Sequence, residues 1–261
     1  MRIRTIIDKE WAEVFKNKLV LMTVIAMPLL FAVLPIIVLA TGSGVNASQM
    51  KNTPQAILQA CTAQGLTDKE CLQSYLVSPF MLFYLLLPLA IPQAIAAYSI
   101  VGEKTTRSLE PLLATPLSTG ELILGKSLAA AIPAVTATWL SFGIFVIASR
   151  FFVASDKVYA IITQPMWFVS MLLLAPLFTA ASVNVAIWIS SRVNDPRAAE
   201  QIGMMIMLPL LAIFFGQILG VITLTIGSIL IASAVMLVID LAMIQLGVKL
   251  FQRETILTRW K

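Results

Sequence analysis

The chain has 261 residues, of which 59% are hydrophobic and only 12% are charged, and its formal net charge is +5. A soluble domain is roughly 45–50% apolar and about 25% charged, so this composition excludes a soluble globular protein and indicates a polytopic membrane protein. The chain has no histidine and only two cysteines, which argues against a metal site built from those residues.

The first 18 residues predict an amphipathic helix on the inner membrane surface. Apolar side chains recur there at helical spacing; they are Ile3, Ile6, Ile7, Trp11, Val14 and Phe15. Trp11 and the basic residues between them suit the headgroup zone. A plain positively charged anchor for the first span is the alternative, but it does not explain the apolar stripe.

Charge-poor runs long enough to cross ~30 Å of hydrocarbon predict six transmembrane helices. They cover residues 19–41, 77–101, 127–149, 165–191, 201–222 and 226–248. The first run is too long for the apolar region of a signal peptide, so we expect it to be a retained span. Pro88 and Pro92 lie one turn apart, which predicts a bend in the second span.

The distribution of Lys and Arg predicts that both termini are cytoplasmic. Fourteen of the eighteen basic residues fall in the two tails and in the loops after spans two and four. Cytoplasmic loops accumulate such residues. The first extracytoplasmic loop is then residues 42–76, and it holds both cysteines, Cys61 and Cys71. On the oxidising side they favour a local disulfide, whereas two free thiols would be expected if that loop faced the cytoplasm.

Residues 102–126 form a short charged segment between spans two and three. Leu109, Leu112 and Leu113 give it an apolar side, so it predicts a short helix parallel to the membrane that docks onto something outside the bilayer. A Ser-x-x-Glu capping box at residues 118–121 predicts the start of the next helix. Residues 120–127 also fit the Walker A expression, but they read as a helix without a preceding strand, so we do not interpret them as a nucleotide site.

The same segment resembles the cytoplasmic signature of the type-two, exporter-type permease subunits of ABC transporters. The matching residues are Glu103, Lys104, Leu109, Glu110, Leu112, Leu113, Thr115, Pro116, Glu121, Gly125 and Lys126. A Gly-Thr pair that is usual in the signature is replaced by Arg107-Ser108. The match covers about a tenth of the chain, and the six-span layout with an amphipathic leader fits the same family over the whole length.

The resemblance implies a permease without an ATPase site or cofactor of its own, paired with a second permease chain and with separate ATP-binding cassette subunits that bind ATP and Mg²⁺. It also implies a multi-pass protein of the plasma membrane, with residues 1–18 as a connecting helix and residues 102–126 as the coupling segment. The expected ATPase-docking residues are Glu103, Lys104, Arg107, Leu109, Glu110, Leu112, Leu113 and Pro116.

Two further features fall within the spans. Asp240 is an ionisable residue at membrane depth, where an acid serves transport or is held structurally by an amide such as Asn184. Gly216 and Gly220 form a G-x-x-x-G spacing, which permits close helix contact between two chains.

The sequence therefore predicts an all-α membrane protein of six spans that exports an amphipathic or hydrophobic substrate, such as a lipid, drug or peptide. An ion-coupled secondary transporter that uses Asp240 and a membrane scaffold without transport are the alternatives. Of these three functions, only ATP-driven export requires an ATPase subunit in stoichiometric amount.

Overall fold

A computed structural model describes residues 2–42, 61–62, 65–105, 119–190 and 192–250. Its elements over these residues are helical, which confirms the all-α prediction. The longer helices are α1 (Arg2–Val14), α2 (Lys18–Gly42), α9 (Thr119–Ser149), α11 (Pro165–Ser190) and α14 (Ile226–Leu250). The shorter ones are α4 (Asp68–Val77), α5 (Phe80–Tyr84), α6 (Leu87–Ala96), η2 (Ala97–Val101), α7 (Gly102–Thr105), α10 (Asp156–Ile162), α12 (Pro196–Gly203), η3 (Met204–Met207) and α13 (Leu208–Ile218).

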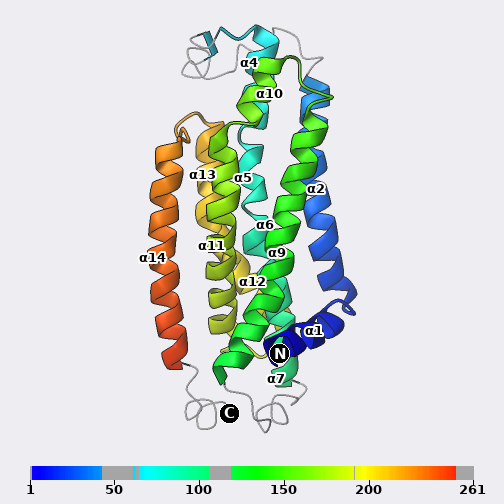
Figure 1. Cartoon of the computed structure of the whole chain (residues 1–261), viewed down its shortest axis with the longest axis vertical. Helices are drawn as coiled ribbons and strands as arrows, with labels where there is room; N and C mark the ends of the chain where they lie inside the picture. The colour runs from blue at the N-terminus through cyan, green and yellow to red at the C-terminus, as the bar shows by residue number, and fades with distance from the viewer. Residues whose placement is uncertain (1, 43–60, 63–64, 106–118, 191, 251–261) are drawn as a thin grey trace.

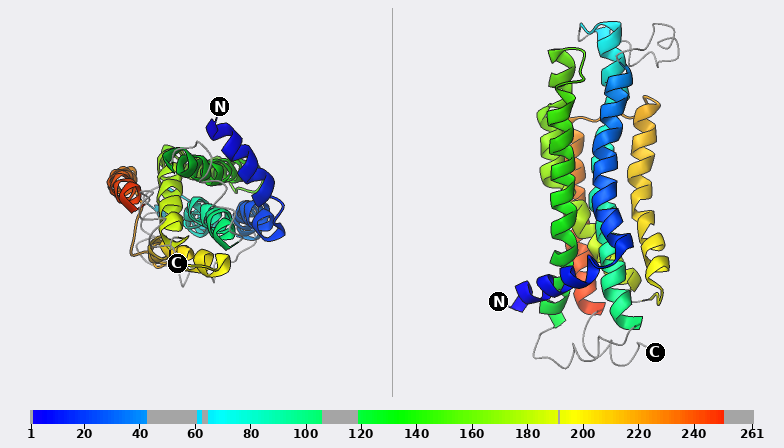
Figure 2. Two further views of the ribbon diagram at one scale, coloured as in Figure 1. Left: turned by 90° about the horizontal axis from the view of Figure 1, so that it is seen from below. Right: turned by 90° about the vertical axis from the view of Figure 1, so that its right-hand side faces the viewer.

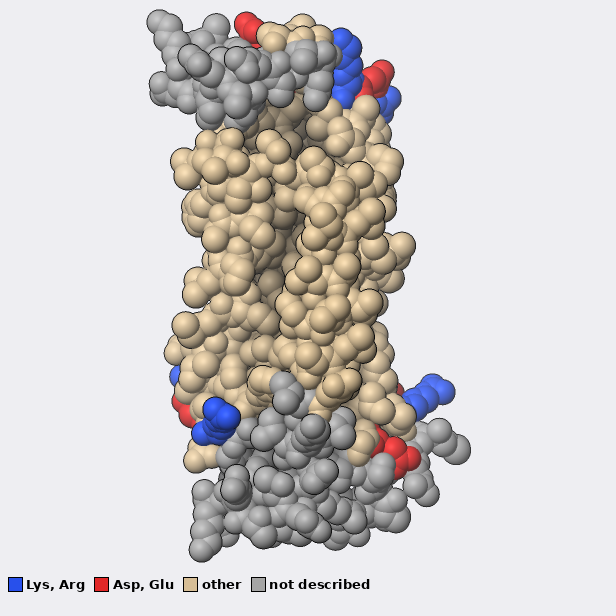
Figure 3. Space-filling view, turned by 90° about the vertical axis from the view of Figure 1, so that its left-hand side faces the viewer, with Lys and Arg blue, Asp and Glu red and all other residues tan. Residues whose placement is uncertain are grey.

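Six stretches of the described chain are long and apolar enough to cross a membrane, as the sequence predicted. They are Val20–Thr41, Asp68–Val101, Gly120–Ser149, Asp156–Ser190, Pro196–Ile218 and Ile226–Gln245. The space-filling view shows an uncharged middle zone between two ends that carry the charged side chains (Figure 3). This surface has the apolar band that a lipid bilayer requires.

The second span is the centre of the bundle and is broken along its length. Its most apolar window is 89% buried, whereas that of the fifth or the sixth span is 17% buried. Seen along the bundle, α6 lies among α2, α9 and α11, and α14 stands at the periphery (Figure 2). Pro88 lies in the first turn of α6, Pro92 lies further inside it, and α6 continues into the π-helical turn η2. Proline removes backbone hydrogen bonds, which agrees with the predicted irregularity of this span.

The two ends of the bundle differ in construction. Helix α1 lies across one end, next to α7 and the start of α9, and we call this the α1 end (Figure 1). At the opposite end, which we call the α4 end, α4 and α10 pack together. There the Gln73 side chain donates to the Leu39 carbonyl at 3.1 Å and accepts from the Ala154 amide at 2.8 Å. One amide thus ties together three segments distant in sequence.

Candidate functional site

Helix α1 packs directly on α9 because a glycine leaves room for it. Ile6, Glu10 and Val14 recur every four residues and are all buried, so they form the face that α1 turns toward the bundle. A Cβ atom on Gly125 would lie 2.7 Å from Cγ2 of Ile6, closer than real side chains approach. The Trp11 indole N–H, which we expected in the headgroup zone, donates to the Ala129 carbonyl of α9 at 2.9 Å. Helix α1 is therefore held by the protein as well as suited to a membrane surface.

Under α1 lies a buried ion cluster formed by Lys9, Glu10, Ser99, Glu103 and Lys126. The Lys126 ammonium lies 2.7 Å from Oε1 of Glu10 and 2.8 Å from Oε2 of Glu103. It also lies 3.0 Å from the Ser99 hydroxyl, which in turn donates to Glu10. Lys9 lies 2.7 Å from Oε1 of Glu103. Four elements, α1, η2, α7 and α9, thus meet at one set of charges.

The five residues of the ion cluster are balanced in charge, with two ammonium groups and two carboxylates, and the exposed Glu13 carboxylate lies 3.6 Å from Lys9 at the solvent side. Balance matters because Glu10, Glu103 and Lys126 are each less than a tenth exposed, and an unpaired buried charge is costly. Burial would raise the pKa of Glu103, but the charge and hydrogen bond of Lys126, together with those of Lys9, lower it overall. Burial would likewise lower the pKa of Lys9, and the bond and charge of Glu103 with the neighbouring acids raise it. Both groups are therefore held in their charged forms.

The π-helical turn η2 directs two neighbouring polar side chains into two different sites near the α1 end. Ser99 enters the ion cluster, and Tyr98, its neighbour in the chain, lines a pocket between α2 and α12. π-helical turns are rare in proteins overall, but those that occur often lie at functional sites. Glu103 follows one turn after Ser99, at the spacing that puts both on the same side of the chain.

The ion pair between Glu103 and Lys126 closes the base of the 102–126 segment. Glu103 stands at the start of that segment, directly after the central span, and Lys126 stands near its end, in the first part of α9. The Walker A-like run lies within α9 from residue 120 onward, and its lysine is engaged by two carboxylates. The two described stems of the segment, residues 102–105 and 119–126, are therefore joined by buried charges.

A family model for the ABC-2 family transporter protein matches residues 4–254 of the chain, which is nearly its whole length. The chain belongs to this family. No curated protein matches the chain closely enough to count as a relative. The protein is therefore a multi-pass permease, the membrane part of an ABC transporter, and its family implies an ABC ATPase as partner.

Of the residues expected to dock the ATPase, the structure describes only the first two. Glu103 is 6% exposed and its side chain faces the ion cluster, so it helps to hold the permease together, and its expected part in docking stays a prediction. Lys104 lies in α7, and nothing further is described of its side chain. The remaining expected docking residues lie outside the described part of the chain; they are Arg107, Leu109, Glu110, Leu112, Leu113 and Pro116.

Asp240 of the permease is buried in α14, which packs against α11. It is 3% exposed, and neither of its carboxylate oxygens has a hydrogen-bond partner among the described residues. The structural clamp to Asn184 that we weighed is thus not formed in this structure. A buried acid without a donor is costly at membrane depth, which keeps a role in transport open as a prediction.

Gly216 and Gly220 do not share one helix. Helix α13 ends at Ile218, and Gly220 has a φ of 71° in the turn that follows. The carbonyl of Gly216 accepts bonds from the amides of Val221 and Ile222, and the Ile222 side chain covers its Cα. The structure thus gives both glycines a role in ending the helix, and their expected part in pairing two chains stays a prediction.

The two cysteines lie at the α4 end of the permease. Cys61 and Cys71 form a disulfide, with Cα atoms 5.5 Å apart. Both are less than a tenth exposed. The bond joins the chain before α4 to α4 itself, at the end of the bundle opposite to the ion cluster. This arrangement agrees with the expectation that residues 42–76 face the oxidising side.

Proposed function

We propose that this permease is the membrane subunit of an ATP-driven exporter, which moves an amphipathic or hydrophobic substrate out of the cytoplasm or the inner leaflet. Two permease chains would pair with two ATPase subunits in the plasma membrane, with the α1 end and both termini in the cytoplasm. The ATPases would bind ATP and Mg²⁺. The distribution of Lys and Arg supports this orientation, and the nearly charge-free spans support an apolar cargo.

One observation carries the coupling part of the proposal: the 2.8 Å ion pair between Glu103 and Lys126. It joins the two stems of the 102–126 segment, and Glu103 directly follows the most deeply buried span. A displacement of the segment by a docked ATPase would therefore reach the central span and α9 together. Lys9 and Glu10 extend the same link to α1, so three elements would respond as a unit.

The docking surface itself would be the apolar side of the segment. Burial of two or three leucines at about 25 cal/mol per Å² is worth several kcal/mol before the cost of association. Leu112→Arg and Leu113→Arg should each release the ATPase without preventing insertion of the spans, because the substitutions add to the positive charge of a cytoplasmic loop. Phe151→Arg is a matched control, since Phe151 is 80% exposed at the α4 end.

The test measures three quantities for each variant: permease abundance in the membrane, ATPase retained on affinity purification, and ATP hydrolysis by the purified complex. We expect normal abundance with loss of the ATPase for both leucine variants, and retention for the control. Retention of the ATPase with wild-type hydrolysis in both leucine variants would show that this segment is not the coupling element. A permease that purifies from native membranes without any ATPase would favour the secondary transporter that uses Asp240.

A further inference from the structure

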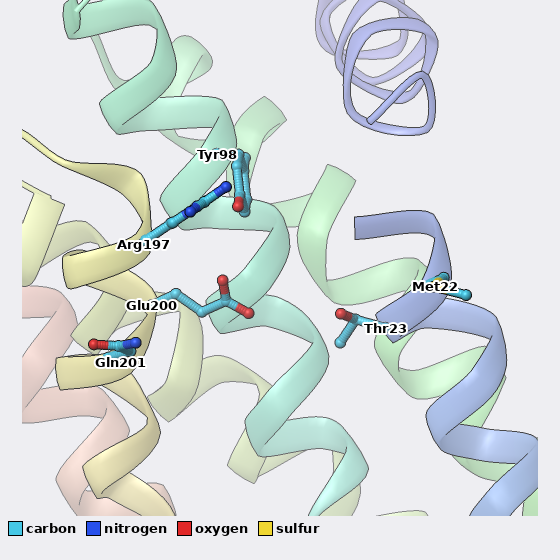
Figure 4. A pocket seen from close by; sticks show the side chains of 6 residues that line it. All are labelled: Met22, Thr23, Tyr98, Arg197, Glu200 and Gln201. Atoms are coloured by element: carbon cyan, nitrogen blue, oxygen red, sulfur yellow. The ribbon is translucent and has the colours of Figure 1, made fainter. Parts of the chain in front are cut away.

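An open pocket of about 340 Å³ lies at the side of the bundle near the α1 end, between span one and span five. Figure 4 shows α2 on one side, α12 on the other and η2 behind. Its lining residues are Met22, Thr23, Tyr98, Arg197, Glu200 and Gln201. Five of the six carry a polar or charged group, which is unusual for a surface that otherwise suits hydrocarbon.

Arg197 and Glu200 face this pocket with opposite charges that do not neutralise each other. Neither side chain has an ion pair or hydrogen bond with any residue that the structure describes. In Figure 4 the guanidinium group extends toward the Tyr98 ring, and the Glu200 carboxylate extends toward the side of Thr23. The pocket thus offers a cation and an anion at separate points, an arrangement complementary to a ligand that carries both charges itself.

The level of the pocket matches the boundary between headgroups and acyl chains. Thr23 lies five residues beyond Lys18, the first residue of α2, which is about 7–8 Å along a helix. Arg197 lies in the first turn of α12. From the pocket toward the α4 end, both walls present exposed apolar side chains to the surroundings. These are Ile25 and Leu29 on α2, and Met205 and Leu208 on η3 and α13.

We propose that this pocket binds the headgroup of a membrane phospholipid that carries both a phosphate and a primary ammonium group. Arg197 pairs with the phosphate through its planar set of donors, and Glu200 accepts from the ammonium. The Tyr98 hydroxyl is a further donor for a phosphate oxygen. The acyl chains lie along the exposed apolar residues of α2 and η3. The inference names a substrate class for the exporter and in that respect rests on the proposed function.

The experiment measures lipid binding by the purified permease alone, in a nonionic detergent, by native mass spectrometry. The probes are phosphatidylethanolamine and phosphatidylglycerol with identical acyl chains, which share the phosphate and differ in the ammonium group. We expect the wild type to prefer phosphatidylethanolamine about fivefold, the scale of a partly exposed charge pair. Arg197→Gln should weaken both lipids by a similar factor, whereas Glu200→Gln should abolish the preference.

Two variants serve as controls. Arg192→Gln removes an exposed arginine at the same end that does not line the pocket, so it should bind both lipids as the wild type does. Arg197→Lys keeps the charge but loses the planar set of donors, so it should retain part of the binding that Arg197→Gln loses, which separates loss of the site from misfolding. Soluble phosphoethanolamine is added as a competitor, and we expect it to compete only at concentrations far above those of the lipid.

Four results would overturn the assignment. They are equal binding of the two lipids by the wild type, unchanged preference in Glu200→Gln, equal losses in the Arg192 and Arg197 variants, and equal loss of binding in Arg197→Lys and Arg197→Gln. If soluble phosphoethanolamine competes at the same concentration as the lipid, the ligand of the pocket is a water-soluble phosphate ester and not a lipid. Because no ATPase is present, these failures are distinct from failure of the proposed exporter, which is judged by ATPase retention and hydrolysis.

Discussion

Removal of the Lys126 ammonium tests whether the ion cluster is held by charge balance. In Lys126→Met, Glu10 keeps the hydrogen bond from Ser99, and its one remaining cation among the described residues is the Lys9 ammonium at 3.8 Å. Glu103 lies 2.7 Å from the same ammonium, which also faces the exposed Glu13 at 3.6 Å, so one ammonium is left beside two buried carboxylates. Loss of one partner of a buried pair costs about 3–5 kcal/mol. For a chain of this size such a loss lowers the unfolding midpoint by roughly 6–20 °C.

The second variant of this test restores neutrality. Lys126→Met with Glu10→Gln leaves Glu103 as the one buried carboxylate of the ion cluster, paired with Lys9 at 2.7 Å, so we expect the double variant to be more stable than Lys126→Met by about 1–3 kcal/mol. Thermal unfolding of the purified permease measures both, and Lys16→Met serves as control because Lys16 is exposed at the same end. A double variant whose loss equals the sum of the two single losses would refute charge balance as the source of stability.

Three further predictions concern other parts of the structure. Gly125→Ala should displace α1 and lower the unfolding midpoint, because its Cβ would lie 2.7 Å from Cγ2 of Ile6. Adding Ile6→Ala should restore only part of the thermal stability, because the Cβ that alanine keeps would still lie 2.9 Å away. Glu103 has a lowered pKa, so its stabilisation is complete above the usual 4.5 and is lost as pH falls through the lower folded value; Lys9 has a raised pKa, so its contribution is complete below 10.5 and is lost above that. The unfolding midpoint measured as a function of pH should therefore fall at both the acid and the alkaline end. The fall at the acid end should be smaller in Glu103→Gln. Asp240→Leu should raise the unfolding midpoint, because neither carboxylate oxygen has a hydrogen-bond partner within the described ranges of the chain. A simultaneous fall in ATP hydrolysis by the complex would assign the acid to transport, and unchanged hydrolysis would exclude that role.

The spans could be predicted from the sequence because hydrocarbon imposes a length and a composition that few other structures require. Pro88 and Pro92 likewise indicated an irregular second span. Proline has no backbone N–H, so it removes a helical hydrogen bond in water and in a membrane alike. The central position of that span was not predictable. It depends on how six similar apolar helices pack, and their side chains differ little in hydrophobicity.

Only part of the ion cluster could be predicted from the sequence. Glu103 and Lys126 belong to the family signature, whereas Glu10 and Ser99 belong to no motif of the sequence analysis. Glu10 falls between Ile6 and Val14 at four-residue spacing, so an acid within the apolar stripe of α1 was the signal that could have identified it. Its partners are separated from it by 89 and 116 residues, and no local pattern indicates such pairings.

The π-helical turn η2 sets how far the second half of the second span is rotated about the helix axis relative to the first half. Above it, α6 is fixed against α11 by the bond from the Gln93 amide to the Ser182 carbonyl; below it, Glu103 is fixed by the ion cluster. A helix advances about 100° per residue, so deletion of one residue within Ala97–Val101 would turn Glu103 by about that angle relative to Gln93. Both contacts could not then be kept. The number of residues in this turn, more than their identity, determines whether the lipid-embedded and the charged portions of the span face their partners together.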